Sequence, residues 1–458
     1  MLTLGFAVAA LALLLSLPFW LPPAVVALRV HIFAMVNGDD AITIPGRLVG
    51  VEQFKRVYAD PAADGRSRGA ALSDLFWYWL APGPEVHQEH LEQGQRYAEV
   101  SAATRRILHT SHATAAGLAA RCTATVLAEL DVRGARLVRL RDVLMPVWAL
   151  FYYELVFGQR CPPAARRLVV DNADDVVTAL KCCGLRHMRR RHRLTSFLEE
   201  RVRAGAVAHE LPRRLSTLEQ ALYLQGTFFN TAIVQMSEAT AHLLMVIAQH
   251  EPVRARLVAD PSDDRYLDRV IDETLRLYPL FGVAHRITSA EIVVDDRVTI
   301  PPGSVLCFNY PRYHRTGFED AARFDPDRWR RLPVRTANHI PFGVPANRPC
   351  PAWHLAPATM RAVVREVLGR FDLSTSAAHT RSLPNRGPCL LWPLAAPAGR
   401  RQRAVLLGFV RLRDRVEDVW RSLVQLVLGT YMVLDARRLR LCTRYFESRP
   451  ATGPGSSP

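Results

Sequence analysis

Lysine is almost absent from this chain, since Lys55 and Lys181 are its two lysines, and yet the formal net charge is +16. Arginine therefore carries the positive charge. No nucleic-acid-binding motif accompanies it, so we exclude nucleic acid as a partner and expect the basic surface to meet an acidic protein or an anionic membrane. The densest basic run, "RHMRRRHR" at 186–193, is interpreted as a solvated helix face.

Closely spaced cysteine pairs are missing as well. The eight cysteines include no C-x-x-C pair, which excludes the usual zinc-ligand spacing and, in a chain of this length, argues against a disulfide scaffold. One cysteine stands in a chemically suggestive setting, because Cys350 lies in the loop "PFGVPANRPCPAWHLA", two residues after Arg348. This thiol is the first candidate functional group.

Sequence repeats and an alternating strand–helix period are absent, and helical patterns dominate. Residues 213–250 contain no proline and are apolar on several faces, which predicts a long helix buried inside a large domain. Residues 265–279 predict a second helix that stops at Pro279. The segments 291–300 and 305–310, joined by the turn "PPGS", predict a β-hairpin. We expect a single domain that is mainly α with a small β part.

Charge is also nearly absent from residues 1–28, a stretch long enough to cross the roughly 30 Å hydrocarbon core of a bilayer as a helix. We interpret residues 1–30 as a membrane anchor with the body of the protein on the cytoplasmic side, because Arg29 and a basic chain follow. A cleaved signal peptide is the alternative, but a basic n-region and a clear cleavage site are missing. Prolines at 18, 22 and 23 leave open a shorter helix that lies partly in the interface.

Three separate motifs occur in a fixed order. In "DETLRLYP", Glu273 and Arg276 lie three residues apart on one helical face and can pair. About fifty residues later, "FDPDRW" places Arg328 in a proline-fixed turn, and the Cys350 loop then opens another helical pattern. Together the three motifs resemble the cytochrome P-450 family of haem-thiolate monooxygenases over roughly residues 40 to 398.

The resemblance implies a haem b cofactor and its ligands. Cys350 would be the proximal ligand of the iron, a role that suits a thiolate because it donates electrons strongly and nearby helix amides keep it ionised. Arg348 and Arg286 would each pair with a haem propionate, with His285 as the alternative to Arg286. The resemblance also assigns Phe342 to the cofactor-binding loop.

A buried ion-pair triad is implied by the same resemblance, formed by Glu273, Arg276 and Arg328. Its charges would be structural, because losing one partner leaves the others buried and unpaired.

Two departures from the family pattern affect the cysteine loop. Phe342 and Cys350 are eight residues apart instead of seven, with Pro345 near the position of the second glycine, and Ala352 replaces the glycine after the cysteine. We expect the loop to absorb the extra residue, and the hydrogen bonding to the sulfur, and hence the redox potential, to be altered.

The central helix lacks the acid–alcohol pair with which the family delivers protons to bound oxygen. The usual spacing falls near Gln235, whereas Asn230 and Thr231 supply an amide–alcohol pair one turn earlier. Thr231 is the first candidate for this catalytic role and Gln235 the second. The alternative is that each is a buried polar residue bonded to its own helix.

Residues near the start of the chain offer further contacts for a propionate. The aromatic stretch 75–90 falls where the family has a variable loop over the substrate, and it carries His87 and His90. Either histidine, or one of Arg105 and Arg106, is a candidate.

Residues 31–398 would then be the haem-thiolate domain, followed by an amphipathic helical extension at 399–447 and a disordered tail at 448–458. The longest uncharged run of the extension, residues 422–434, is too short to span a bilayer. Two interpretations stay open for it: a position at the membrane surface beside the anchor, or docking on a partner.

The predicted function is a membrane-anchored monooxygenase that inserts one atom of dioxygen into a small, largely hydrophobic substrate. A ferredoxin or a flavoprotein reductase would supply the electrons. The alternatives are a peroxide-using, isomerising or dehydrating enzyme of the same fold, and a non-catalytic haem-binding module.

Overall fold

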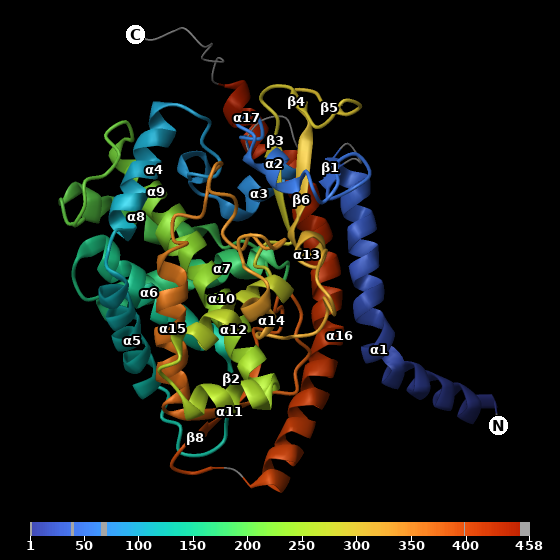
Figure 1. Cartoon of the computed structure of the whole chain (residues 1–458). Helices are drawn as coiled ribbons and strands as arrows, with labels where there is room; N and C mark the ends of the chain where they lie inside the picture. The colour runs from blue at the N-terminus through green and yellow to red at the C-terminus, as the bar shows by residue number, and fades with distance from the viewer. Residues whose placement is uncertain (1, 38–40, 66–70, 398, 449–458) are drawn as a thin grey trace.

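The long apolar segment of the sequence forms the central helix of the computed structural model, which describes residues 2–37, 41–65, 71–397 and 399–448. The helix has three parts, α9 (Thr217–Leu224), η2 (Gln225–Ala232) and α10 (Ile233–Gln249), and η2 is π-helical. It begins with a capping box in which Ser216 and Glu219 satisfy each other's backbone amides. Its apolar side chains are buried on nearly every face, so it is the core of the fold (Figure 1).

Other helices surround the central one. Those that contact it directly include α6 (Leu140–Phe157), α7 (Pro163–Leu180), α12 (Asp264–Leu277) and α15 (Leu355–Leu368), and α5 (His112–Ala128) packs in turn against α6 and α15. The remaining helices of this body are α2 (Phe54–Ala59), α3 (Ala71–Leu80), η1 (Pro84–Val86), α4 (Gln95–Leu108), α8 (Met188–Arg203), α11 (Glu251–Ala259), α13 (Tyr310–Tyr313) and α14 (Arg328–Arg331).

Short strands form small sheets toward opposite ends of the molecule (Figure 1). In the first sheet, β6 (Val305–Asn309) lies between β1 (Ala41–Ile44), which is parallel to it, and β3 (Val283–Ile287), which is antiparallel. In the second, β8 (Pro388–Pro393) pairs antiparallel with β2 (Arg136–Arg139) and β7 (Phe371–Ser374). The prediction of a mainly helical fold with a small β part is confirmed.

The predicted hairpin between residues 291–300 and 305–310 is wrong. The first segment closes on itself as β4 (Ile292–Val293) and β5 (Thr299–Ile300). The reason is local, since the Asp295 carboxylate accepts the backbone amides of Arg297 and Val298 and makes a tight turn between these strands. The second segment becomes β6 and buries alternate side chains in the first sheet.

The basic run at 186–193 is only in part the solvated face that was predicted. Arg189, Arg190 and Arg193 are exposed, but Arg191 is fully buried. Its guanidinium donates to the Asp175 carboxylate of α7 and to the carbonyls of Trp79 and Ala81. One arginine of the run therefore ties α8 to two other segments, and a charge pattern alone does not distinguish it from its neighbours.

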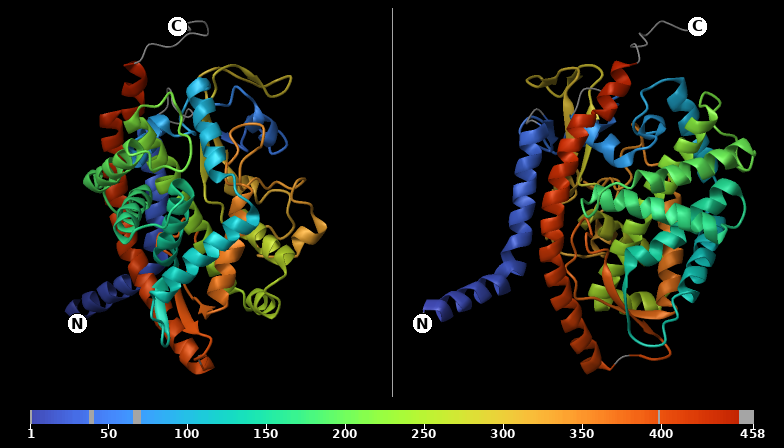
Figure 2. Two further views of the ribbon diagram at one scale, coloured as in Figure 1. Left: turned by 90° about the vertical axis from the view of Figure 1, so that its left-hand side faces the viewer. Right: turned by 180° about the vertical axis from the view of Figure 1, so that it is seen from behind.

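Two long helices from the chain ends lie side by side along the body (Figure 2). These are α1 (Leu2–Asn37) and α16 (Arg400–Leu439), and a short helix, α17 (Leu441–Glu447), follows the latter. Within α1, Gly5–Ile32 is long and apolar enough to cross a membrane and is almost entirely exposed, whereas Thr217–Gln249, which is also long and apolar enough, is mostly buried in the core. Met1 and most of the tail predicted as disordered, residues 449–458, lie outside the described residues.

Candidate active site

The structure brings the predicted triad together at the end of α12. Glu273 accepts two hydrogen bonds of 2.8 Å from Arg276 and one of 2.9 Å from Arg328. The Trp329 indole and the Asp325 backbone amide also donate to it. Since Glu273 and Arg276 have no exposed surface, this is a closed network in the core rather than a surface ion pair.

The two arginines of the triad also hold the chain that precedes the cysteine loop. Arg276 donates to the carbonyls of Ala321 and Arg323, and Arg328 donates to that of Glu319. The segment 319–325 has no regular structure of its own, so these charge-assisted bonds fix its path. The triad thus positions the chain on its way to Cys350.

The cysteine loop closes on itself by backbone hydrogen bonds. The Cys350 amide donates to the Phe342 carbonyl at 2.9 Å, and Val344 pairs with Asn347 across a tight turn. Pro345 lies at the exposed tip of that turn together with the residue that follows it. The extra residue of the loop is therefore absorbed at the solvent side, away from the sulfur.

Asn347 fastens the loop to the segment after α2, a contact that the sequence did not indicate. Its side-chain amide donates to the carbonyls of Tyr58, Asp60 and Ala63 at distances between 2.9 and 3.1 Å. The side chain is 6% exposed, so one buried amide joins the cysteine loop to three backbone carbonyls.

The Cys350 thiol is half-buried, and its chemistry is set by that position. Burial raises its pKa to about 11, the backbone amide of Ala352 lowers it, and Glu89 raises it. A free thiol with this pKa is protonated at neutral pH, so ionisation has to accompany the binding of a metal ion. Helix α15 begins at Leu355, so the amide of Ala352, which hydrogen-bonds to the sulfur, comes from the turn before the helix.

The guanidinium of Arg348 is fully engaged within the protein. It donates to the Asp64 carboxylate at 2.7 Å and to the carbonyls of Gln88 and Leu91 at 2.6 and 2.7 Å, and it lies over the ring of Tyr97. Its backbone adopts the left-handed conformation with φ of 48°. These contacts tie the cysteine loop to two remote segments, and its predicted pairing with a propionate stays a prediction.

Arg286 on β3 is buried with open hydrogen-bonding capacity. Its Nη2 donates to the Tyr58 hydroxyl at 3.3 Å, and its Nη1 lies 3.7 Å from the Glu89 carboxylate. Among the described residues, nothing accepts a hydrogen bond from its Nε or Nη1, although the side chain has no exposed surface. A buried guanidinium with unused donors is suited to binding a carboxylate such as a haem propionate.

His285, the alternative to Arg286, points elsewhere. Successive residues of a strand face opposite sides, and its Nε2 lies 3.2 Å from the Ser73 hydroxyl while its ring stacks on Phe76. Arg105 and Arg106 contact Ser101 and the Glu210 carbonyl respectively. The donors around Cys350 and Arg286 therefore fit haem, and Arg286, which still has free donors, stays the candidate for a propionate.

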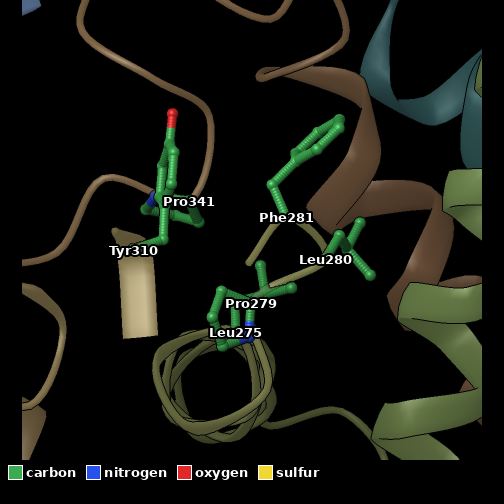
Figure 3. Close-up of a pocket in the computed structure, with 6 residues that line it drawn as sticks. All are labelled: Leu275, Pro279, Leu280, Phe281, Tyr310 and Pro341. Carbon is green, nitrogen blue, oxygen red and sulfur yellow. The ribbon is translucent and has the colours of Figure 1, made fainter. Parts of the chain in front are cut away.

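The turn that follows α12 packs against the start of the cysteine loop (Figure 3). A hollow of about 10 Å³, barely enough for one water molecule, separates the two. It is lined by Leu275, Pro279, Leu280, Phe281, Tyr310 and Pro341. This mostly apolar contact links the triad helix to the loop.

Thr231 lies in the π-helical turn of the central helix, and its hydroxyl is 3.2 Å from His87 Nε2. The preceding Asn230 turns away and accepts a hydrogen bond from Asn172 of α7. Gln235 is half-buried on α10, one turn further on. The partner of Thr231 is thus a histidine from the segment after η1, and sequence reasoning missed both this pairing and the π-helix.

Tyr152 of α6 connects this helix to the cysteine. Its ring contacts that of Phe228, with 6.3 Å between the centroids. Burial raises the pKa of Tyr152, and the nearby Cys350 raises it further. No motif in the sequence marks this residue, whose ring contacts η2 and whose hydroxyl is close enough to Cys350 for the two groups to interact electrostatically.

Comparison with protein families gives one match, to the model described as "Cytochrome P-450", over residues 245–394. These residues hold the triad, the cysteine loop and Arg286, so the match rests on the part of the chain that forms the site.

The curated relatives match this chain over less than half of their own length. A Mycobacterium tuberculosis protein named as cytochrome P-450 135B1 is 31% identical over 33% of this chain and 34% of that protein. The cyclooctat-9-en-7-ol 5-monooxygenase of Streptomyces melanosporofaciens is 30% identical over 40% of this chain and 46% of its own length. The chain thus matches between a third and a half of these relatives.

Solved structures agree in fold. Cytochrome P-450SP alpha in complex with (R)-ibuprophen superposes with a TM-score of 0.61 at 15% identity, covering 74% of this chain and 88% of the other. A variant of cytochrome P-450 OleT in complex with arachidonic acid gives 0.60 at 14% identity, covering 79% and 89%. At such low identity the likeness shows the fold alone.

Proposed function

The chain belongs to the cytochrome P-450 family, whose members bind haem b, and we propose that it is a haem-thiolate monooxygenase for a small, largely hydrophobic substrate. The observation that supports this best is the Cys350 loop. The loop that carries the half-buried thiol is held by backbone bonds, by Arg348 and by Asn347. Asn347 bonds to Tyr58, and the hydroxyl of Tyr58 accepts a bond from the buried Arg286, which has unused donors.

Cys350 Sγ would hold the iron, and Arg286 would hold a propionate. Bound haem supplies the activation of oxygen, which the protein's own side chains do not provide. The protein's part is to keep the sulfur in place and its surroundings dry. The triad and Arg348 do the first, and the buried rings of Tyr152, Phe228 and Phe229 do the second.

Proton delivery is assigned to the pair formed by Thr231 and His87. The Thr231 hydroxyl passes a proton toward the site, and His87 Nε2 replaces it across the 3.2 Å contact. Gln235 is the second candidate for this role. The arrangement replaces a carboxylate by an imidazole, because Asn230 is committed to Asn172.

The redox partner and the membrane attachment belong to the same proposal. An arginine-rich chain with a net charge of +16 suits an acidic electron donor, such as a ferredoxin or a flavoprotein reductase. The exposed apolar helix α1 would hold the protein at a membrane with the haem domain, residues 31–398, in the cytoplasm. Two bacterial relatives named cyclooctat-9-en-7-ol 5-monooxygenase and pentalenene oxygenase support a hydrophobic substrate.

A reduced, carbon monoxide-bound difference spectrum tests the thiolate. The wild-type protein is compared with Cys350→Ser and with Cys307→Ser, a half-buried cysteine on β6. We expect the long-wavelength Soret band of thiolate ligation in the wild type and in Cys307→Ser and its loss in Cys350→Ser. A band that survives the Cys350 substitution would overturn the assignment.

A peroxide-using enzyme is the second candidate, and one observation favours it. The amide of Asn230 occupies the position before Thr231 where the family carries an acid, and a histidine takes over the contact. Turnover with a reductase and oxygen is therefore measured beside turnover with hydrogen peroxide. Turnover with hydrogen peroxide, combined with no turnover with the reductase and oxygen, would replace the monooxygenase proposal by this one.

A further inference from the structure

Helix α16 carries a continuous apolar stripe on its outer face. Nine large apolar side chains, each at least 40% exposed, follow one another at intervals of three or four residues. They are Val405, Phe409, Leu412, Val416, Trp420, Leu423, Val427, Tyr431 and Leu434. Such spacing places all of them along one face of a helix.

The opposite face of α16 is already used by the protein. Val410 packs with Leu390 and Trp392 of β8, and Met432 and Val433 pack with Leu75 and Tyr78 of α3. The helix is thus fixed on the body, and the stripe points outward for most of its length. A soluble surface rarely carries a contiguous apolar patch of this extent, which marks an interaction site.

The stripe adjoins the other large apolar surface of the molecule, α1. The two helices run side by side (Figure 2), and Arg415 of α16 lies over the ring of Phe19. A groove of about 290 Å³ between them is lined by residues of both helices, including Val30 and Val433. Because Gly5–Ile32 has the length and hydropathy of a membrane span, α1 would bring the neighbouring stripe to the surface of a bilayer.

The charges of α16 indicate the chemistry of the occupant. The helix has nine arginines against four acidic residues. Exposed arginines flank the stripe at positions 401, 411, 413, 415, 437 and 438. Long arginine side chains can bury their stems beside apolar residues and bring the guanidinium to a phosphate. A phospholipid surface offers acyl chains and anionic headgroups together.

The same charges exclude a transmembrane position for α16. Arg411, Arg413, Arg415 and Glu417 lie near its middle, whereas the hydrocarbon core tolerates such residues poorly. The helix would instead lie in the plane of the interface. Only the N-terminal part of α1 diverges from α16 (Figure 2), so that part would enter the bilayer and the rest would lie beside the stripe.

We propose that the outer face of α16 binds the surface of an anionic phospholipid bilayer and, together with α1, fixes how the body sits on the membrane. The proposal does not depend on the proposed catalytic function. It assigns a role to the C-terminal extension, which the matched family region, residues 245–394, does not include.

Quenching of tryptophan fluorescence by brominated phospholipids tests the contact on the full chain. Trp420 lies in the stripe and is 69% exposed, while Trp353, at the cysteine loop, is 59% exposed and lies outside it. The full-length protein is mixed with vesicles of phosphatidylcholine, with and without about one-third phosphatidylglycerol. Wild type is compared with Trp420→Phe, Trp353→Phe and Trp20→Phe, the last reporting on α1.

We expect Trp420→Phe to lose part of the lipid-quenched fluorescence and Trp353→Phe to lose none, with a larger Trp420 difference in the anionic vesicles. Equal behaviour of Trp420→Phe and Trp353→Phe would overturn the proposal. An equal Trp420 signal in both kinds of vesicle would overturn the role of the arginines. If the protein were a dimer in detergent that Val427→Asp converts to a monomer, and Trp420 were not quenched, the stripe would be a contact between copies. The carbon monoxide spectrum is independent of all these outcomes.

Discussion

Thr231 Oγ1 lies 3.2 Å from His87 Nε2, which joins the π-helical turn of the central helix to the segment after η1. A π-helical turn widens the helix and frees backbone and side-chain groups that a regular helix would pair. His87 is 8% exposed and donates or accepts according to its tautomer, so a proton can move in either direction along the contact.

Removing the Thr231 hydroxyl should therefore slow turnover. For Thr231→Val we expect oxidation of a surrogate substrate to fall about 100-fold, at the low end of general acid–base effects. The carbon monoxide spectrum should stay unchanged, because the cysteine loop is untouched. The measurement is the oxidation rate with its solvent isotope effect.

Thr231→Ser and His87→Phe complete this test. Serine keeps the hydroxyl and should retain most of the activity, whereas His87→Phe should match Thr231→Val. Full activity of His87→Phe would remove histidine from the proton path and shift attention to Gln235.

Glu273→Gln should destabilise the whole domain. The neutral amide cannot balance two buried guanidinium groups, and breaking a buried ion pair costs about 3–5 kcal/mol. Chemical denaturation followed by circular dichroism measures the loss. Glu199→Gln is the control, because it alters an exposed ion pair with Arg203 and should cost no more than about 0.5 kcal/mol. Similar losses in the two variants would contradict a structural role for the triad.

Motif spacing made the triad and the cysteine loop readable from the sequence. Glu273 and Arg276 lie on one turn of a helix, so their pairing follows from helix geometry alone. The turn that carries Arg328 and the loop that carries Cys350 are marked by proline and glycine, which restrict the backbone wherever they occur.

Contacts that cross the fold were beyond the sequence. Arg348 contacts Asp64, 284 positions away in the sequence, and Thr231 contacts His87, 144 positions away. The residue type at one position does not predict which distant residue it will contact. The predicted partner of the strand at 305–309 is wrong for a related reason. This strand pairs with β1 and β3, which are distant in the sequence, and not with the segment just before it. Burial of Arg191 likewise depends on α7, which supplies Asp175.

The two arginines near the cysteine should respond differently to truncation. Arg286→Met removes a buried guanidinium with unused donors, so the haem-free protein should keep its stability while haem binding weakens. One lost charge-assisted hydrogen bond of about 1.5–3 kcal/mol corresponds to roughly a 10- to 100-fold loss of affinity. Haem transfer to apomyoglobin measures this change.

The haem-free Arg348→Met protein should instead unfold more easily, because Asp64 and two carbonyls lose their only charged partner in the described contacts. We expect a loss of about 3 kcal/mol or more in denaturation experiments. If Arg348→Met lowered haem affinity without affecting the haem-free fold, Arg348 rather than Arg286 would be the main propionate partner.

Asp272, next to the triad, should make stability depend on pH. Burial and the adjacent Glu273 raise its pKa to about 7, above the ordinary value of 3.8. A raised pKa means that the folded state favours the neutral carboxyl. Its contribution to the free energy of unfolding is therefore complete below pH about 4 and is lost as pH rises through about 7. Asp272→Asn does not titrate, and it should be the more stable protein by roughly 1–2 kcal/mol at pH 8, a value reduced for the 27% exposure of the side chain.

Urea denaturation between pH 5 and 8 should show the difference growing up to pH 7 and then levelling off, while the exposed Asp171→Asn control stays parallel to the wild type. A constant difference across this range would show that Asp272 is ionised throughout in the folded protein.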